Sequence, residues 1–195
     1  MVDLQQVAKL RQQTGCGIND CRNALEEAGG DVDKAMEVLR KKGELKAAKK
    51  SAERETKEGI IYSYIHPNKK IGSMVELDCE TDFVARNEEF QALAKDLAMQ
   101  IAATNPLYLK PEDIPEEVLN KEKEIYKEQL LAESKPEDMI DKIVEGKLSK
   151  WYEEVCLLKQ SFIKDEDLTI EDLIKEKIAK IGEKIEIDNF VRFEV

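Results

Sequence analysis

The chain has 195 residues, 37% of them charged, and a formal net charge of −11 at pH 7. This length can bury a proper core in one domain or two unequal ones, whereas the negative charge argues against direct nucleic-acid binding, which needs a positive surface. The sequence contains no run of about 18 apolar residues and no basic region ahead of an apolar stretch, so we expect no membrane partner, no secretory signal and a cytoplasmic location.

The first 43 residues predict three short helices. Gly29 and Gly30 are suited to a helix C-terminus, Asp31 can cap the next helix, and Gly43 follows a final basic turn. The apolar residues at helical spacing are Leu4, Val7 and Leu10, then Ile18, Cys21, Leu25 and Ala28, then Val32, Ala35, Met36 and Leu39. A module this small is expected to lean on a partner or on the rest of the chain.

Residues 40–57 carry eight Lys or Arg residues against three Glu residues. We interpret 44–57 as a charged connecting helix with a solvated face. The alternative is a docking stripe for an acidic partner.

Two strands are predicted next, at 59–65 and 71–79, joined by the turn 66–70. In the second strand Val75, Leu77 and Cys79 share one face with Ile71, while Glu76 and Asp78 share the other with Glu80. This alternation is typical of a half-buried antiparallel sheet.

A strongly amphipathic helix is predicted over 90–101, ending at Asn105 and Pro106. The stretch 111–158 is helical in period and acidic, with twelve Asp or Glu residues against five Lys residues between 111 and 146. Pro115 and Pro136 lie where helices are expected to begin.

A last helix, with apolar residues from Ile170 to Ile181, precedes a terminal strand after Gly182. In that strand we expect Ile185, Ile187, Val191 and Phe193 to share one face, and the strand to join the hairpin as a third strand. The predicted fold class is α+β, with three N-terminal helices and a helix-rich core around a three-stranded antiparallel sheet.

Few residues suggest catalysis, and we predict no catalytic, cofactor-binding or metal-binding residue. The single histidine, His66, lies in a turn, and the four cysteines read as free thiols. The pair Cys16 and Cys21 lacks a second pair for zinc, and the Gly-x-Gly at 15–17 lacks the strand that a dinucleotide site needs. The acidic row 76–80 could in principle hold a divalent cation, although a solvated face is the plainer interpretation.

The segment 81–87 reads as a contact site. It follows directly on the second strand and presents Phe83 between the charged residues Asp82 and Arg86. A large apolar residue flanked by charge at the end of a rigid element has the usual form of an interface anchor. The alternative is a helix cap followed by a core phenylalanine.

Two segments carry a resemblance to a known family: LRQQTGCGINDCRNAL at 10–25 and ELDCETDFVARN at 76–87. They resemble the two signatures of bacterial elongation factor Ts, the nucleotide exchange factor of elongation factor Tu. The runs KAAKK at 46–50 and IAKIGE at 178–183 also fall where that family has similar runs, and the length fits the short form of the family.

The resemblance implies a ubiquitin-associated-like three-helix domain at 1–54 and an α+β core at 55–195. It implies a protein without chemical catalysis of its own, which binds the GTPase domain of elongation factor Tu and promotes GDP release near the magnesium and phosphate loop. No cofactor is implied. Two copies can pair in short members, and the segment 183–195 offers an exposed edge for this. The implied partner-binding residues are Thr81, Asp82, Phe83, Val84, Arg86 and Asn87 in the second motif, and Arg11, Ile18, Asn19 and Arg22 in the first.

The chain departs from the family pattern at three positions. Ile18 and Asn19 stand where family members often have two methionines, and Lys184 replaces a common asparagine. A rival hypothesis is a stand-alone adaptor that works through the acidic segment 111–146.

Overall fold

The computed structural model describes residues 4–14, 16–53, 55–133 and 136–195, without the side chains of 44–53 and 137–138. Gly15 of the first motif and Arg54 of the basic stripe therefore lie outside the described residues, as do the side chains of Lys46, Lys49 and Lys50. The fold is α+β, as predicted, with three N-terminal helices and a three-stranded antiparallel sheet.

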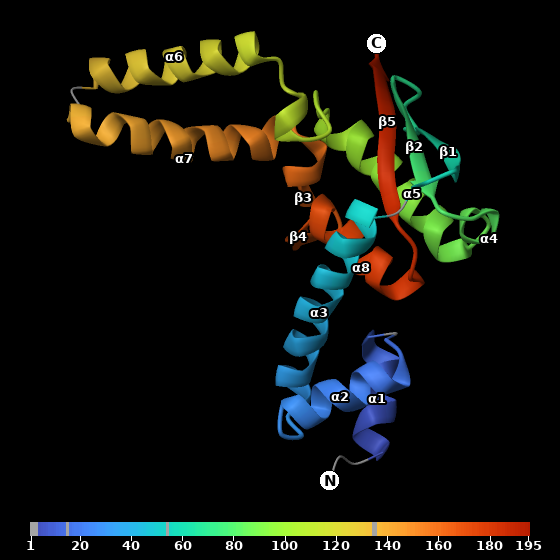
Figure 1. Cartoon of the computed structure of the whole chain (residues 1–195). Coiled ribbons are helices and arrows are strands. Elements are labelled where there is room, and N and C mark those ends of the chain that lie inside the picture. The colour runs from blue at the N-terminus through green and yellow to red at the C-terminus, as the bar shows by residue number, and fades with distance from the viewer. Residues whose placement is uncertain (1–3, 15, 54, 134–135) are drawn as a thin grey trace. The chain divides into compact units, whose positions relative to one another are not determined.

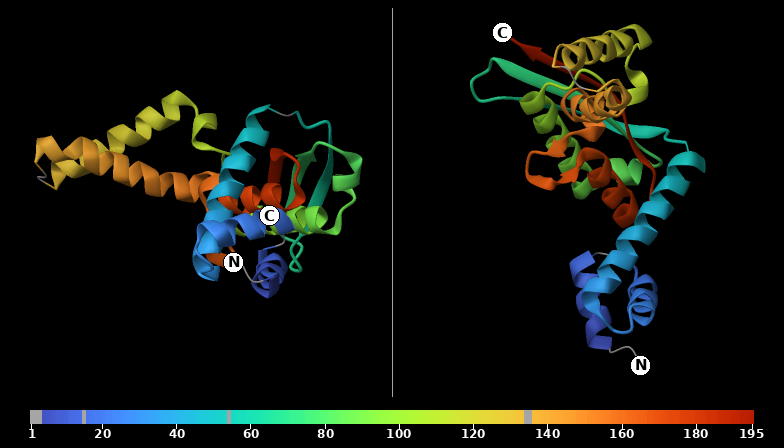
Figure 2. Two further views of the ribbon diagram at one scale, coloured as in Figure 1. Left: turned by 60° about the horizontal axis from the view of Figure 1, so that its bottom comes forward. Right: turned by 90° about the vertical axis from the view of Figure 1, so that its left-hand side faces the viewer.

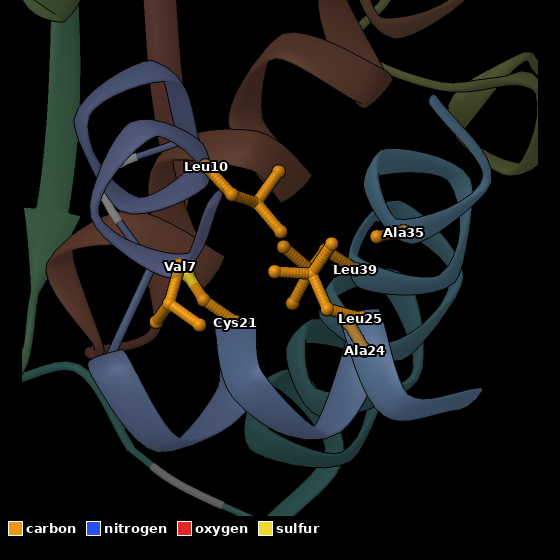
Figure 3. Packing of buried hydrophobic residues seen from close by; sticks show 7 residues of the cluster. All are labelled: Val7, Leu10, Cys21, Ala24, Leu25, Ala35 and Leu39. Carbon is orange, nitrogen blue, oxygen red and sulfur yellow. The ribbon is translucent and has the colours of Figure 1, made fainter. Parts of the chain in front are cut away.

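The three predicted N-terminal helices are confirmed as α1 (Leu4–Thr14), α2 (Ile18–Glu27) and α3 (Val32–Glu53). Gly29 and Gly30 adopt φ angles of 65° and 88°, which lets the chain turn after α2. Asp31 caps α3 by accepting hydrogen bonds from the amides of residues 33 and 34 at 3.0 and 3.1 Å. Seven buried residues form the core of these helices (Figure 3): Val7, Leu10, Cys21, Ala24, Leu25, Ala35 and Leu39.

The expected end of the third helix at Gly43 was wrong. Helix α3 continues through Gly43 to Glu53, so the third helix and the connecting helix are one element (Figure 2). A single glycine inside a helix costs only about 1 kcal/mol relative to alanine, and helix-forming residues follow it.

The main sheet contains β1 (Glu58–Ile65), β2 (Ile71–Cys79) and β5 (Ile185–Glu194) in the order β1-β2-β5 (Figure 1). The amide of His66 donates to the carbonyl of Ile71 at 2.9 Å, which closes the predicted hairpin. The amide of Val195 donates to the carbonyl of Lys70 at 3.0 Å. The terminal strand therefore joins the hairpin as a third strand, as predicted, and its partner in the sheet is β2.

The predicted faces of β2 are confirmed, since Val75, Leu77 and Cys79 are buried while Glu76 and Asp78 are partly exposed. The predicted amphipathic helix is α5 (Glu88–Thr104). The buried hydroxyl of Ser73 donates to the carbonyl of Ala98 at 2.6 Å, so α5 lies against this face of the strand.

Strand β5 departs from the predicted alternation after Asp188. Ile185 and Ile187 are buried, but Asp188 and the next residue are both exposed, and Phe193 is 66% exposed. The guanidinium of Arg192 instead turns toward α5, where its Nε donates to the carbonyl of Ala102 at 3.0 Å. Two consecutive exposed residues shift the alternation by one, as a β-bulge does. Phe193 therefore lies on the outward face.

The acidic stretch forms the antiparallel hairpin of α6 (Glu116–Ala132) and α7 (Glu137–Val155), which lie side by side in Figure 1. Pro115 and Pro136 are the N-cap residues, as predicted. Short 3₁₀ helices flank the hairpin at Pro111–Asp113 and Leu157–Lys159. Leu130, Ile140, Val144 and Leu148 are buried between the helices, and Trp151 packs against them.

A two-stranded sheet after the hairpin was not predicted. It pairs β3 (Ser161–Phe162) with β4 (Asp165–Thr169), ahead of α8 (Ile170–Ile181). Two-residue strands are too short to give a periodic signal. A buried polar network supports this region, since the Gln160 side-chain oxygen accepts hydrogen bonds from Gln100 at 3.2 Å and from Thr104 at 2.6 Å.

The chain folds into two compact units, each assembled from separated segments. The first unit comprises Met1–Tyr62, Glu76–Ala94 and Asp172–Asp188, and the second comprises Ser63–Val75, Lys95–Glu171 and Asn189–Val195. Among the residues that the structure describes, none of the helices has the length and apolar character needed to cross a bilayer.

Two neighbouring leucines of α6 provide a test of the hairpin core. Leu130 is 1% exposed and Leu131 is 54% exposed. We expect Leu130→Ala to lower the free energy of unfolding by about 2–5 kcal/mol, because it leaves a cavity, and Leu131→Ala to lower it by less than about 1 kcal/mol. Urea unfolding followed by the fluorescence of Trp151, the single tryptophan, measures both. Equal losses would contradict the described packing.

Candidate functional site

The candidate site begins where β2 ends. Thr81 has extended backbone angles and caps the four-residue helix α4 (Asp82–Ala85), because its hydroxyl oxygen accepts a hydrogen bond from the amide of Val84 at 3.4 Å. The carbonyl of Thr81 also accepts from the amide of Ala85 at 3.2 Å. The strand therefore passes into a tight, capped turn rather than into a loose loop.

Helix α4 buries one side and leaves the other in water. Val84 and Ala85 are 9% and 7% exposed, whereas Phe83 is 81% exposed. Phe83 is thus not a core residue. The buried phenylalanine in this region is Phe90 on the following helix α5, which is 0% exposed. An exposed ring on a fixed backbone is a feature of binding surfaces.

Charged side chains flank the exposed ring. The carboxylate of Asp82 lies 3.2 Å from the Arg86 guanidinium, and both side chains are substantially exposed, at 47% and 80%. An exposed pair contributes little to stability. Both groups are therefore accessible to a partner without a large structural cost.

Asn87 joins α4 to α5. Its side-chain oxygen accepts from the amide of Glu89 at 2.7 Å, and its carbonyl accepts from the amide of Gln91 at 3.0 Å. Asn87 therefore caps the following helix, so the segment is fixed at its C-terminal end as well as at Thr81.

The residues between α8 and β5 form hydrogen bonds to the start of this segment. The carboxylate of Glu183 accepts hydrogen bonds from both the amide and the hydroxyl of Thr81, at 3.1 and 2.7 Å. The amide of Lys184 donates to Glu80 at 2.6 Å. Sequence reasoning did not place Glu183 in the site. The signal in the sequence was the IGE run at 181–183, which resembles a run of the elongation factor Ts family.

An ion pair adds a further contact from α8. Lys180 lies 2.6 Å from the carboxylate of Glu89 in the first turn of α5. The hydrogen bond from this lysine lowers the pKa of Glu89 below its usual value. The carboxylate lies in the first turn of α5, where the N-terminus of a helix favours negative charge.

Cys79 lies directly before the segment but is not suited to act as a nucleophile. Burial raises the pKa of its thiol to about 11. Its sulfur donates to the carbonyl of Thr81 at 3.2 Å. The thiol is therefore protonated at neutral pH and contributes packing rather than reactivity.

The first motif lies on α1 and α2. Arg11, Ile18, Asn19 and Arg22 are all exposed, and Ile18 is 53% exposed. Ile18 and Arg22 are one turn apart and so share a face of α2. The Arg22 guanidinium lies 3.7 Å from Glu26. Cys21, on the same helix, is fully buried. Helix α2 therefore has one face toward the core and one toward solvent.

Other candidates from the sequence have ordinary surroundings. His66 is exposed in the hairpin turn, where its Nδ1 accepts from the amide of Asn68 at 3.4 Å. Burial, with the neighbouring carboxylates of Glu76, Asp188 and Glu186, raises the pKa of Asp78. Within the described ranges, no group of three His, Cys, Asp or Glu residues is arranged to hold a metal ion.

Comparison with known proteins gives matches along the whole chain. A family model described as Elongation factor TS matches residues 8–195. The chain is 59% identical over 195 residues to a protein named Elongation factor Ts from Thermosipho melanesiensis, covering 100% of this chain and 99% of that protein. It is 60% identical over 194 residues to one of the same name from Thermodesulfovibrio yellowstonii, covering 100% and 96%.

Phe83 and Phe90 allow an exposed and a buried phenylalanine of the first unit to be compared for their contribution to stability. We expect Phe90→Ala to lower the free energy of unfolding by about 3–5 kcal/mol, because Phe90 is fully buried. We expect Phe83→Ala to change it by less than about 0.5 kcal/mol. Urea unfolding followed by far-ultraviolet circular dichroism compares the two. A large loss of unfolding free energy in Phe83→Ala would show that the Phe83 side chain stabilises the fold.

Proposed function

The chain belongs to the elongation factor Ts family, whose members are nucleotide exchange factors in translation elongation, and we propose that it acts in the cytoplasm on elongation factor Tu. It binds the GTPase domain of that partner and promotes GDP release by disturbing the magnesium and phosphate site. The observation that carries this proposal is the 81% exposure of Phe83 on a capped, rigid segment.

The mechanism follows from how a GTPase holds its nucleotide. Magnesium and the backbone amides of the phosphate loop hold the phosphates of the nucleotide. An aromatic ring that wedges against the supporting elements, with a carboxylate next to the cation, weakens those contacts. In this chain Phe83 provides the ring and Asp82 the carboxylate.

No covalent chemistry is required of this protein in that mechanism, since release of GDP breaks only noncovalent contacts. We therefore propose an exchange factor without chemical catalysis of its own and without a cofactor. Linkage makes the effect reciprocal, so bound nucleotide weakens the exchange factor as much as the exchange factor weakens the nucleotide. Rebinding of nucleotide then expels the exchange factor and completes the cycle.

Both motifs contribute to the proposed interface. In the second motif, Thr81, Val84 and Asn87 form and support the turn, while Asp82, Phe83 and Arg86 provide exposed groups. In the first motif Arg11, Ile18, Asn19 and Arg22 provide an exposed, mainly polar surface for docking on the same GTPase domain. Ile18 supplies its main apolar contact.

We also propose that residues 1–54 form a domain distinct from 55–195. Support comes from the buried residues of α1, α2 and α3, which form a cluster of their own. The net charge of −11 supports a protein partner rather than direct contact with nucleic acid.

The chain is further proposed to form a homodimer through the outward face of β5 and its neighbours. The hydrogen bonds at 66–71 and 195–70 set a register in which Gly72 lies between Ile65 and Phe193. These two side chains are 68% and 66% exposed, and Met74 on the same face is 44% exposed. Because Gly72 has no side chain, the apolar groups can form a continuous surface that a second copy would cover.

Replacement of the exposed ring tests the exchange mechanism. We expect Phe83→Ala to raise the barrier to GDP release from elongation factor Tu by about 1–4 kcal/mol, because an interface anchor is lost. Release of fluorescently labelled GDP at increasing exchange-factor concentration measures this. Leu107→Ala is the control, since Leu107 is also exposed, at 62%, but lies outside both motifs. GDP release at the wild-type rate by Phe83→Ala would remove this residue from the mechanism.

A charge on the outward face of the sheet tests the dimer. We expect the wild-type chain to sediment at about twice its mass of 22.3 kDa and Phe193→Glu to sediment as a monomer, because a carboxylate would be buried without a partner. Leu131→Glu on α6 is the control and should leave the mass unchanged. Sedimentation of the wild-type chain as a monomer at all concentrations would contradict the dimer.

A further inference from the structure

We propose that Glu183 is a positioning residue for nucleotide exchange, which holds Thr81 so that Phe83 and Asp82 are presented in one fixed orientation. This inference rests on the function proposed above for the segment 81–87. It adds a residue from a different part of the chain, 102 positions from Thr81.

The geometry is that of a carboxylate bound to two donors on one residue. One oxygen of Glu183 accepts from the Thr81 amide at 3.1 Å, and the other accepts from the Thr81 hydroxyl at 2.7 Å. An ionised carboxylate supplies two acceptor oxygens and no donor, whereas the amide side chain of glutamine supplies one acceptor oxygen and one donor group. Hydrogen bonds to a charged group are also stronger than those between neutral groups.

The hydroxyl of Thr81 is therefore both a hydrogen-bond donor and a hydrogen-bond acceptor. It donates to Glu183 and accepts from the amide of Val84, which caps α4. The side chain cannot rotate without losing both bonds. Because Phe83 lies between Thr81 and Val84 in the chain, this arrangement sets the direction in which its side chain leaves the backbone.

The corner that carries Glu183 is itself fixed. Gly182 has a φ angle of 94°, which L side chains rarely adopt, and its amide donates to the carbonyl of Ile178 at 2.9 Å to end α8. On one side of Glu183 the amide of Lys184 binds Glu80, and on the other Lys180 pairs with Glu89. Contacts thus reach the residues before and after the exposed ring.

Rigidity matters here because the ring works against another protein. A side chain that displaces part of a GTPase needs a backbone that keeps its conformation in the complex. A segment that is ordered before binding also loses less conformational entropy on binding. Buried Val84 and Ala85 hold one side of α4, and Glu183 holds its beginning. Loss of Glu183 is therefore expected to weaken exchange through Phe83.

The test is a double-mutant cycle in GDP release from elongation factor Tu, with Glu183→Ala and Phe83→Ala alone and together. We expect Glu183→Ala to slow the maximal release rate at least about 10-fold in the wild-type background and less than about 2-fold in the Phe83→Ala background. Glu183→Gln retains one acceptor and should be intermediate. Glu176→Ala, an exposed acid on α8, is the control and should leave the rate unchanged.

Three results would overturn the inference. If Phe83→Ala is slow while Glu183→Ala releases GDP normally, the positioning role fails and the proposed function stands. If Glu183→Ala slows release equally in both backgrounds, it does not act through Phe83. If Phe83→Ala itself has no effect, the proposed function of the segment fails and this inference fails with it.

A structural measurement covers the case in which Glu183→Ala does not fold. In Glu183→Gln and in Thr81→Val, amide hydrogen exchange followed by nuclear magnetic resonance should show lost protection at Val84, whose amide is bound by the Thr81 hydroxyl. Thr81→Ser keeps both donors and should keep the protection. Full protection at Val84 in Glu183→Gln and Thr81→Val would overturn the inference.

Discussion

Two hydrogen bonds from Thr81 to the carboxylate of Glu183 tie the start of α4 to the residues between α8 and β5. A large apolar ring in water has no intrinsic reason to stay there, because burial of a phenylalanine is favourable by about 1.5–3 kcal/mol. The backbone around Phe83 must therefore be held so that the ring cannot fold inward. The Thr81 cap, the buried side of α4 and the Asn87 cap together provide that constraint.

The fixed backbone of α4 also determines which chemical groups this surface exposes. Once α4 is fixed, its outward side presents one ring and the Asp82–Arg86 ion pair, which are groups that a partner can engage through apolar contact and charge. The neighbouring thiol of Cys79 is buried and protonated, so this surface offers binding groups rather than a nucleophile. This is the composition expected of a protein that acts on a GTPase by contact.

The two motifs differ in how they are supported. The second motif lies between a sheet strand and a long amphipathic helix, and its backbone is bound at several points. The first lies on a small three-helix core that includes two alanines and a cysteine among its seven buried residues. Small side chains bury little apolar area. The second motif therefore has more backbone and side-chain support than the first.

The sequence by itself determined the elements with strong periodicity. Three N-terminal helices, the hairpin of β1 and β2, helix α5 and a terminal strand followed from apolar spacing and from glycine, proline and aspartate at the boundaries. The motif ETDFVARN also predicted the candidate site, and that assignment stays a prediction. Local signals were sufficient for these elements because the period of a helix or strand depends on residues close together in the chain.

Only the tertiary structure decided the features that join distant residues. The sequence favoured an exposed Phe83, but only the structure excluded the alternative of a core phenylalanine, because burial depends on which other elements pack against α4. The shift of alternation at Asp188, which turns Arg192 inward and Phe193 outward, depends on strand pairing. The contact of Glu183 with Thr81 spans 102 residues, and such a distance carries no local pattern.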